Sequence, residues 1–243
     1  MSMPITTDAP AAAPAPTSDR RTRALLACGV GPLLFIVVIL IEGAFRPGYS
    51  ALHHWGSELS LSEYGWQQII NFLVAGVMTL AFAVGLRRAL APRGGPGAAA
   101  IPLLTGLLGV CLIVQGVFVC DPYVGYPAGS QGTADASFHG WVHGINMFPT
   151  FVAYSGVILA AAYCAFRRRD GLPWALFSLI AGIVVPVALY IGITRFNMDT
   201  QTGTYHGLWQ RISLGTGGLW FALLAARLLR RHDSHPRSTA ATG

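Results

Sequence analysis

The stretch that decides the fold is residues 24–45, which read ALLACGVGPLLFIVVILIEGAF and contain one charged side chain, Glu42. A helix needs about 20 predominantly apolar residues to cross the hydrocarbon core of a bilayer. Five further stretches of this kind follow, so the six predicted spans are 24–45, 68–90, 99–120, 142–166, 173–194 and 207–229. The pattern predicts an all-α polytopic membrane protein with six transmembrane helices.

The composition supports this prediction and excludes an ordinary soluble domain. Hydrophobic residues make up 53% of the 243 residues and charged residues make up 11%, whereas soluble domains carry about 25% charged residues. The 16 basic residues are all arginine, and the net charge is +6. We interpret this charge as a signal of membrane topology, so no nucleic-acid partner is expected and membrane lipid is the expected partner.

The positions of the arginines predict the orientation of the chain. They cluster before the first span and after the second, fourth and sixth spans, whereas the other three connections hold only Arg46, Arg195 and Arg211. Positively charged segments that flank spans stay in the cytoplasm. We therefore expect a multi-pass protein of the cell membrane with both termini in the cytoplasm and three loops outside.

The two ends of the chain differ from the spans. Residues 1–19 are rich in Ala, Pro, Ser and Thr, and residues 232–243 contain few apolar side chains. Such segments cannot bury enough apolar surface to offset the entropy of ordering. We predict disordered cytoplasmic tails at 1–19 and 232–243 and one six-helix transmembrane domain at 20–231.

Polar side chains gather at the predicted outer ends of the spans. A polar group inside a bilayer is costly and usually faces the bundle interior or a wet cavity. The set therefore predicts an outward-facing polar cavity that binds a small molecule or lipid. Its candidate residues are Glu42, Ser57, Glu58, Gln68, Asn71, Gln115, Asp121, His139, His143, Asn146, His206, Gln210 and Arg211. For each residue alone, a hydrogen bond between helices is the simpler alternative.

Two of these residues, His139 and His143, are spaced one helical turn apart on the same face. Together with His206 and Asp121 they could form a zinc site, because zinc takes four nitrogen, sulfur or oxygen ligands. A metal with a free position would activate water. An alternative function is therefore a membrane-embedded hydrolase that acts on a lipid-like substrate. The simpler alternative is a histidine pair that only anchors the end of a helix.

Acid–base chemistry without a metal is a further hypothesis for the same region. Partial burial near the membrane boundary would raise the pKa of Glu42, Glu58 or Asp121 towards the range of a general acid. The catalytic candidates are therefore Asp121, His139, His143 and Glu58. Helix capping or pairing with an arginine would explain the same carboxylates. A third function class is a structural or assembly protein, and the oligomeric state stays open.

The starts of the second, fourth and sixth spans can be aligned as a threefold repeat. They read YGWQQIIN at 64–71, HGWVHGIN at 139–146 and HGLWQRIS at 206–213, with glycine at the second position and isoleucine at the seventh. The first, fifth and eighth positions lie on one helix face. The alignment predicts three helical hairpins whose polar stripes converge near the outer leaflet, as repeats in membrane proteins often surround a central site.

Several short motifs occur in order along the chain. They are Arg46-Pro47-Gly48-Tyr49-Ser50, Ser57-Glu58-Leu59-Ser60, Gly116-Val117-Phe118, Asp121-Pro122, Gly125-Tyr126-Pro127 and His139-Gly140-x-x-His143. Together they resemble the bacterial and archaeal six-span membrane proteins of domain of unknown function 998. The resemblance implies six spans and distinctive outer loops, and it implies no activity, substrate or cofactor.

Overall fold

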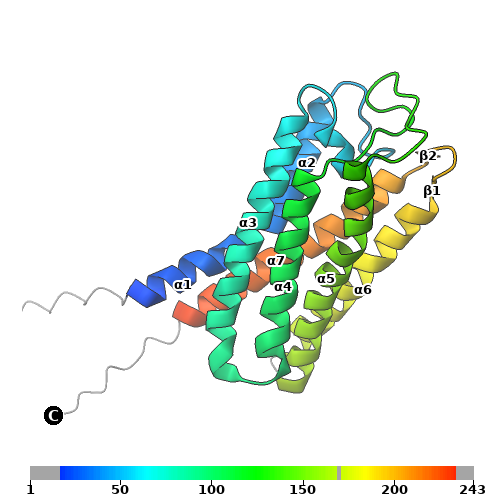
Figure 1. Ribbon diagram of the computed structural model, residues 1–243. Coiled ribbons are helices and arrows are strands. Elements are labelled where there is room, and N and C mark those ends of the chain that lie inside the picture. Colours follow the sequence, from blue (N-terminus) through cyan, green and yellow to red (C-terminus); the bar gives the residue numbers. More distant parts are fainter. Residues whose placement is uncertain (1–16, 169–170, 234–243) are drawn as a thin grey trace, which may run out of the picture.

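The computed structural model describes residues 17–168 and 171–233, most of which are helical (Figure 1). The long helices are α1 (Thr17–Ala27), α2 (Gly31–Phe45), α3 (Gly65–Leu90), α4 (Pro96–Val117), α5 (Phe138–Arg168), α6 (Leu172–Thr194) and α7 (His206–Asp233). The short helices are η1 (Cys28–Val30), η2 (Gly56–Ser60) and η3 (Ala91–Arg93). Strands β1 (Phe196–Asn197) and β2 (Thr202–Gly203) pair antiparallel in a small hairpin.

The predicted tails overlap only slightly with the described part of the chain. Residues 1–16 and 234–243 lie outside the described residues. Helix α1 already begins at Thr17, inside the predicted N-terminal tail, and α7 runs on to Asp233, inside the predicted C-terminal tail.

All six predicted spans are confirmed as helices that are long and apolar enough to cross a bilayer. They are Arg20–Phe45, Gly65–Leu90, Pro96–Val117, Phe138–Arg168, Leu172–Thr194 and His206–Arg231. The first of them joins α1, η1 and α2 into one span. The chain is therefore an all-α polytopic membrane protein.

Several predicted boundaries differ by a few residues, and the third span is displaced as a whole. The sequence predicts a third span over 99–120, but α4 begins at Pro96 and ends at Val117. Proline is favoured in the first turn of a helix, where its missing N–H group would have had no partner. At the other end the backbone of Phe118 is extended, and its carbonyl oxygen is bound by the side chain of His143.

The spans form a closed ring. Each long helix from α2 onward packs against the next one along the chain, and α7 packs against α2. In Figure 1 the three long loops gather at the top of the bundle, and the short α3–α4 connection, the end of α5 and the start of α6 lie at the bottom. We call the loops at 46–64, 118–137 and 195–205 the loop face. We call the opposite end the arginine end, because α3 and α5 both have arginines in their last turn there.

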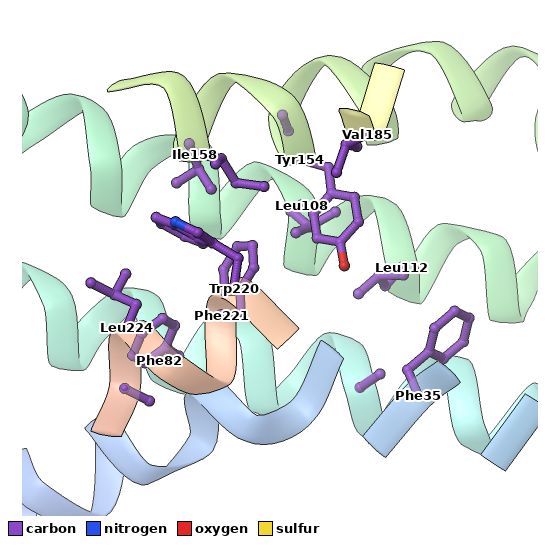
Figure 2. Close-up of a cluster of buried hydrophobic side chains, with 14 of the residues drawn as sticks. Phe35, Phe82, Leu108, Leu112, Tyr154, Ile158, Val185, Trp220, Phe221 and Leu224 are labelled. Carbon is purple, nitrogen blue, oxygen red and sulfur yellow. The ribbon is translucent and has the colours of Figure 1, made fainter. Parts of the chain in front are cut away.

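Aromatic side chains fill the ring towards the arginine end. Trp220 and Phe221 of α7 are fully buried, and Figure 2 shows them in one cluster with Phe82 and Tyr154. Phe221 stacks on Tyr154 with 5.6 Å between ring centroids, and Nε1 of Trp220 donates to the hydroxyl of Ser178 over 2.9 Å. In a bilayer, close packing and hydrogen bonds between helices supply the stability that the hydrophobic effect supplies in water.

Each helical hairpin of the ring has a hydrogen bond from its second helix to its first. The donor is the residue at the eighth position of the predicted repeat, and the acceptor is a backbone carbonyl. The bonds join Asn71 to Phe35 over 3.0 Å, Asn146 to Cys111 over 2.8 Å and Ser213 to Val185 over 2.7 Å. Each bond gives a polar side chain a partner inside the bundle, so that the side chain is not exposed to lipid. The repeat itself stays a prediction.

The same steric constraint explains why glycine occupies the second position of the alignment at all three helix starts. A Cβ atom on Gly65, Gly140 or Gly207 would overlap an oxygen atom of the loop face. These oxygens belong to the Ser60 carbonyl, the Asp121 carboxylate and the His54 carbonyl, respectively. Oxygen atoms are favoured at these places because the first N–H groups of a helix have no partner within the helix and carry partial positive charge.

We predict that Gly140→Ala destabilises the protein, because the added methyl group must displace the Asp121 carboxylate. Overpacking of this kind costs about 1–3 kcal/mol and would be measured as a lower melting temperature of the purified protein. Gly144→Ala is the matched control, since no atom lies within 4 Å of the Cβ position there and alanine favours the helix. Equal melting temperatures for the two variants would contradict the steric role of Gly140.

Candidate functional site

Arg46 fixes the first loop to the end of α2. Its guanidinium donates to the carbonyl of Leu59 from Nη1 and to that of Tyr64 from Nη2, each over 3.2 Å. Glu42, one turn earlier on α2, pairs with the same guanidinium at 3.7 Å. Glu42, a predicted cavity residue, therefore takes part in an ion pair that positions the loop.

Arg211 joins the last helix to the same loop. Nη1 donates to the carbonyls of His54 over 3.0 Å and Gly207 over 2.8 Å, and Nη2 donates to the hydroxyl of Tyr49. Tyr49 in turn donates to the carbonyl of Trp55 over 2.9 Å. Burial raises the pKa of Tyr49 further than the nearby guanidinium lowers it, so the phenol keeps its proton. Arg211 is thus a tie between α7 and the first loop.

The second and third loops are linked to each other and to the first. Gln201 in the third loop and Thr133 in the second exchange two hydrogen bonds, over 3.1 and 2.5 Å. The buried ring of Tyr126 in the second loop lies 5.3 Å from the rings of both Tyr49 and His54 in the first. The three loops therefore form one connected cap over the end of the bundle.

Asp121 and Ser137 cap the first turn of α5. The carboxylate accepts hydrogen bonds from the N–H of Ser137 over 2.8 Å and from its hydroxyl over 2.6 Å. The same hydroxyl oxygen accepts a bond from the N–H of Gly140 over 3.0 Å. A serine placed in this way satisfies an N–H group that the helix leaves unpaired. These contacts match the capping alternative for Asp121.

Glu58 is enclosed inside the first loop. It is 1% exposed, and its Oε1 accepts a hydrogen bond over 2.6 Å from the N–H of Trp55, the residue before η2. Burial raises the pKa of this carboxyl to about 8, although the Trp55 hydrogen bond and the charge of Arg211 both lower it. Glu58 is therefore mostly protonated at neutral pH, as a general acid would need to be, but it lies behind the cavity wall described below.

The two histidines of the predicted pair have different surroundings. His139 is exposed at the loop face, with its ring 5.3 Å from that of Phe118. His143 is buried, and its Nδ1 lies 2.7 Å from the carbonyl oxygen of Phe118. Because a carbonyl oxygen only accepts, Nδ1 carries the proton of the neutral ring and Nε2 is left as an acceptor. The two imidazole rings of the pair therefore lie in different environments.

His206 is buried between two aromatic rings. It is 2% exposed, and its ring lies 4.7 Å from Trp55 and 5.0 Å from Phe196. Neither ring nitrogen has a hydrogen-bond partner within the described residues. Residues 17–168 and 171–233 contain no group of three or more His, Cys, Asp or Glu side chains that could hold a metal ion. The structure thus does not bring together the four residues predicted as zinc ligands, because each is held in a different local contact.

Two further predicted residues, Gln68 and Asn71, lie between helices. Gln68 is fully buried, and its Oε1 accepts a hydrogen bond from Nδ2 of Asn71 over 3.0 Å. The same amide nitrogen of Asn71 reaches the carbonyl of Phe35, as described above. Together with Asn146, these residues match the simpler alternative of hydrogen bonds between helices.

Below the loop cap the ring encloses a cavity of about 370 Å³. This volume lies in the range of small-molecule sites, which is about 300–1,000 Å³. Four predicted site residues line the cavity, namely Ser57, Gln115, His143 and Gln210. Most of the wall is apolar, and Phe35 and Leu112, at one edge of the buried cluster in Figure 2, belong to it. The cavity is therefore continuous with the core below it.

Most of the polar lining residues lie near the loop face. At 1.5 Å per residue, Gln115, His143 and Gln210 lie within about 9 Å of the loop-face ends of α4, α5 and α7. The deeper lining residues Leu214 and Phe151, about 12–20 Å from the same ends of α7 and α5, are apolar. Thr150 lies at a similar depth, but its hydroxyl already donates to a backbone carbonyl of its own helix over 2.6 Å. The polar groups available to a ligand therefore lie near the loop face, whereas apolar lining residues occur at both depths.

Three aromatic side chains, one from each loop, cover the cavity at the loop face. Phe196 lies 5.8 Å from Trp55 and 5.0 Å from Tyr123 between ring centroids, and all three line the cavity. Cys120 also lines it, and burial raises the pKa of its thiol to about 12. This thiol is therefore neutral and unreactive. We call Trp55, Tyr123 and Phe196 the aromatic roof.

The apolar part of the wall was missed by reasoning from the sequence. Apolar residues that face a cavity have the same helical spacing as those that face a packed core. One signal was present, since Met147 and Phe151 follow His143 at intervals of four residues on one face of α5. Extending the histidine face along the helix would have found them.

Comparison with known proteins identifies one relationship. Residues 29–227 match the family model described as protein of unknown function (DUF998). No curated protein and no solved structure matches the chain. The matched region contains the cavity, the loop cap and the aromatic roof.

We predict that Glu58 makes the stability of the protein depend on pH. The folded protein keeps this proton up to about pH 8, whereas an ordinary glutamate loses it near 4.5. The folded state therefore binds an extra proton between these values, so the free energy of unfolding falls as the pH rises through this window. Melting temperatures measured from pH 5 to 8 should fall in the wild type.

Glu58→Gln is the control for this prediction, because the amide oxygen can still accept the N–H of Trp55 while the side chain no longer titrates. Other groups in the cap, such as His54, titrate in both proteins and cancel in the comparison. A difference in melting temperature between wild type and Glu58→Gln that does not change with pH would show the assignment to be wrong.

Proposed function

We propose that this chain, which belongs to the DUF998 family of proteins of unknown function, binds a neutral amphiphilic small molecule or lipid in the cavity beneath the loop cap. The observation that carries this proposal is that the polar groups of the wall available to a ligand lie near the loop face, whereas the deeper wall offers apolar side chains and the already paired hydroxyl of Thr150. A ligand with one polar and one apolar end satisfies both parts. A uniformly polar ligand would lose its hydration against the apolar part without compensation.

The composition of the wall favours an uncharged ligand. Among the described lining residues there is no aspartate, glutamate, lysine or arginine. A charged group placed there would be desolvated without a partner of opposite charge. Arg211, which follows the lining residue Gln210, is already engaged by the first loop, and the carboxyl of Glu58, which follows the lining residue Ser57, is mostly protonated at neutral pH.

The polar lining residues favour a head group that both donates and accepts hydrogen bonds. Oε1 of Gln115 is a buried acceptor without a partner in the described part of the chain, and His143 adds its Nε2 acceptor. Oε1 of Gln210 accepts the N–H of Gly56 over 2.7 Å, which orients that amide and leaves its Nε2 as a donor. A hydroxyl group can satisfy both kinds of partner, so we propose an alcohol.

We also propose that the protein lies in the cell membrane with both termini in the cytoplasm. The support is the pairing of arginines at the ends of α3 and α5, together with the arginines that flank the first and last spans. In this orientation the loop cap and the polar end of the cavity lie at the outer surface of the membrane.

We predict that a medium-chain alcohol binds in the cavity. Protein in lipid nanodiscs would be irradiated with a decanol derivative carrying a diazirine at the end of its tail, and labelled residues would be mapped by mass spectrometry. Labelling is expected near Phe151 and Leu214, the deep apolar part of the wall. Unlabelled decanol should compete, whereas decane, decyl sulfate and decyltrimethylammonium should compete poorly.

A substitution at Gln115 tests whether the ligand has a hydroxyl head group. Gln115→Leu keeps the size of the side chain but removes the amide, so decanol should compete about tenfold less well while decane competes as before. Gln131→Leu, in an exposed part of the second loop, is the matched control. Labelling that is spread over the lipid-facing surface, or equal competition by all four compounds, would refute the proposed binding function.

We predict the orientation from reporter fusions. Green fluorescent protein fused after Arg231 should fluoresce, because it folds in the cytoplasm, and alkaline phosphatase inserted after Gly129 in the second loop should be active, because it folds outside. When the two reporters are exchanged between these positions, neither the fluorescence nor the phosphatase activity should be detected. The reverse pattern would overturn the proposed orientation and leave the binding proposal untouched.

A further inference from the structure

Aromatic rings cover the cavity towards the loop face. The aromatic roof is made of rings in mutual contact, and the loops that carry them are joined by hydrogen bonds and ring contacts. Trp55 and Cys120, which line the cavity from above, are 9% and 6% exposed. A ligand arriving from the water at this face would have to part three loops.

The exposed lining residues indicate that the cavity opens at its side, towards α5 and α6. Three lining residues are exposed at the surface there, namely Gly144 on α5, Ile193 at the end of α6 and Met198 in the third loop. Met198 is 67% exposed, and no atom lies within 4 Å of the Cβ position of Gly144. Figure 1 shows α5 and α6 diverging from the arginine end towards the loop face. Each contains an internal proline, which weakens the helix on one side and allows it to bend.

The surface around this opening is apolar. The exposed side chains there are Trp141, Ile145 and Phe148 on α5 and Val187 and Tyr190 on α6. Both helices are spans, so these side chains face lipid. Gly144 directly follows His143 in the sequence, so the opening lies at the same depth as the polar part of the wall. An amphiphile with its head group at the membrane surface could therefore enter sideways without moving the head group through the hydrocarbon core.

We propose that the ligand is a membrane-dissolved lipid-like molecule that enters and leaves through this lateral mouth between α5 and α6. The proposal rests on the proposed binding function and narrows it, because it excludes a ligand delivered from water through the loop cap. The ligand class is a single-chain neutral lipid with a hydroxyl head group, whose chain follows its head group from the surrounding bilayer.

The test measures how fast the cavity fills from the membrane. Nanodiscs containing the protein are mixed with vesicles carrying the diazirine decanol, and labelling at Phe151 and Leu214 is followed over time. Gly144→Trp places a large side chain in the mouth and should slow this labelling about tenfold without lowering its final extent, as for a blocked access route. Ile193→Trp obstructs the mouth from α6 and should have the same effect, so the result does not depend on one variant folding.

A matched control separates blocking from other effects. Leu103→Trp adds the same bulk to an exposed position on α4, away from the mouth and outside the cavity lining, so it should label at the wild-type rate. Unchanged rates in both mouth variants, or a faster rate when the roof is opened by Trp55→Ala, would overturn the lateral mouth. Absence of cavity labelling in the wild type would instead refute the binding function on which this inference rests.

Discussion

The buried guanidinium of Arg211 is the interaction on which the loop face depends. Arginine stays charged at physiological pH, so its burial requires acceptors close by. It finds them in the first loop, at the carbonyl of His54 and the hydroxyl of Tyr49, although 157 and 162 residues of sequence separate these partners from it. The last helix can therefore satisfy its arginine only by lying against the first loop, and this contact closes the ring at the end where the cavity lies.

Closure at both ends explains why the larger of the two described cavities lies in the half near the loop face, with about 370 Å³ against about 80 Å³ near the arginine end. Towards the arginine end, Trp220 and Phe221 meet side chains from several helices and leave little space (Figure 2). At the loop face the cross-linked loops carry the aromatic roof across the ring, so the side chains below it do not have to meet. The cavity is thus held open between two packed layers, and its polar upper wall and apolar lower wall reflect the two environments that they adjoin.

The fold could be read from the sequence because a bilayer imposes length and composition on every span, but the site could be read only in part. The positions of Gln115, His143, Gln210 and Ser57 in the wall follow from the rule that polar groups avoid lipid. The sequence also predicted that His206 and Asp121 lie together, but the structure places them apart. His206 packs between aromatic rings and Asp121 caps α5, and the loop conformation that decides these positions cannot be read from the sequence. For Asp121 and Glu58 the capping alternative agrees with the observed contacts. The steric reason for Gly65, Gly140 and Gly207 needed the oxygen atoms of the loops, which no sequence pattern places.

The hydrogen bonds of Asn71, Asn146 and Ser213 have a consequence for how the protein is made. Each joins two consecutive helices, so each hairpin can leave the translocon with this polar side chain already paired. Lateral release into lipid is disfavoured by unpaired polar groups, and these bonds lower that barrier one hairpin at a time. Arg211 is different, because its partners belong to the first hairpin and must already be waiting in the membrane when the last hairpin arrives. Biogenesis of this protein therefore has a built-in order, in which the first hairpin acts as the template that receives the last.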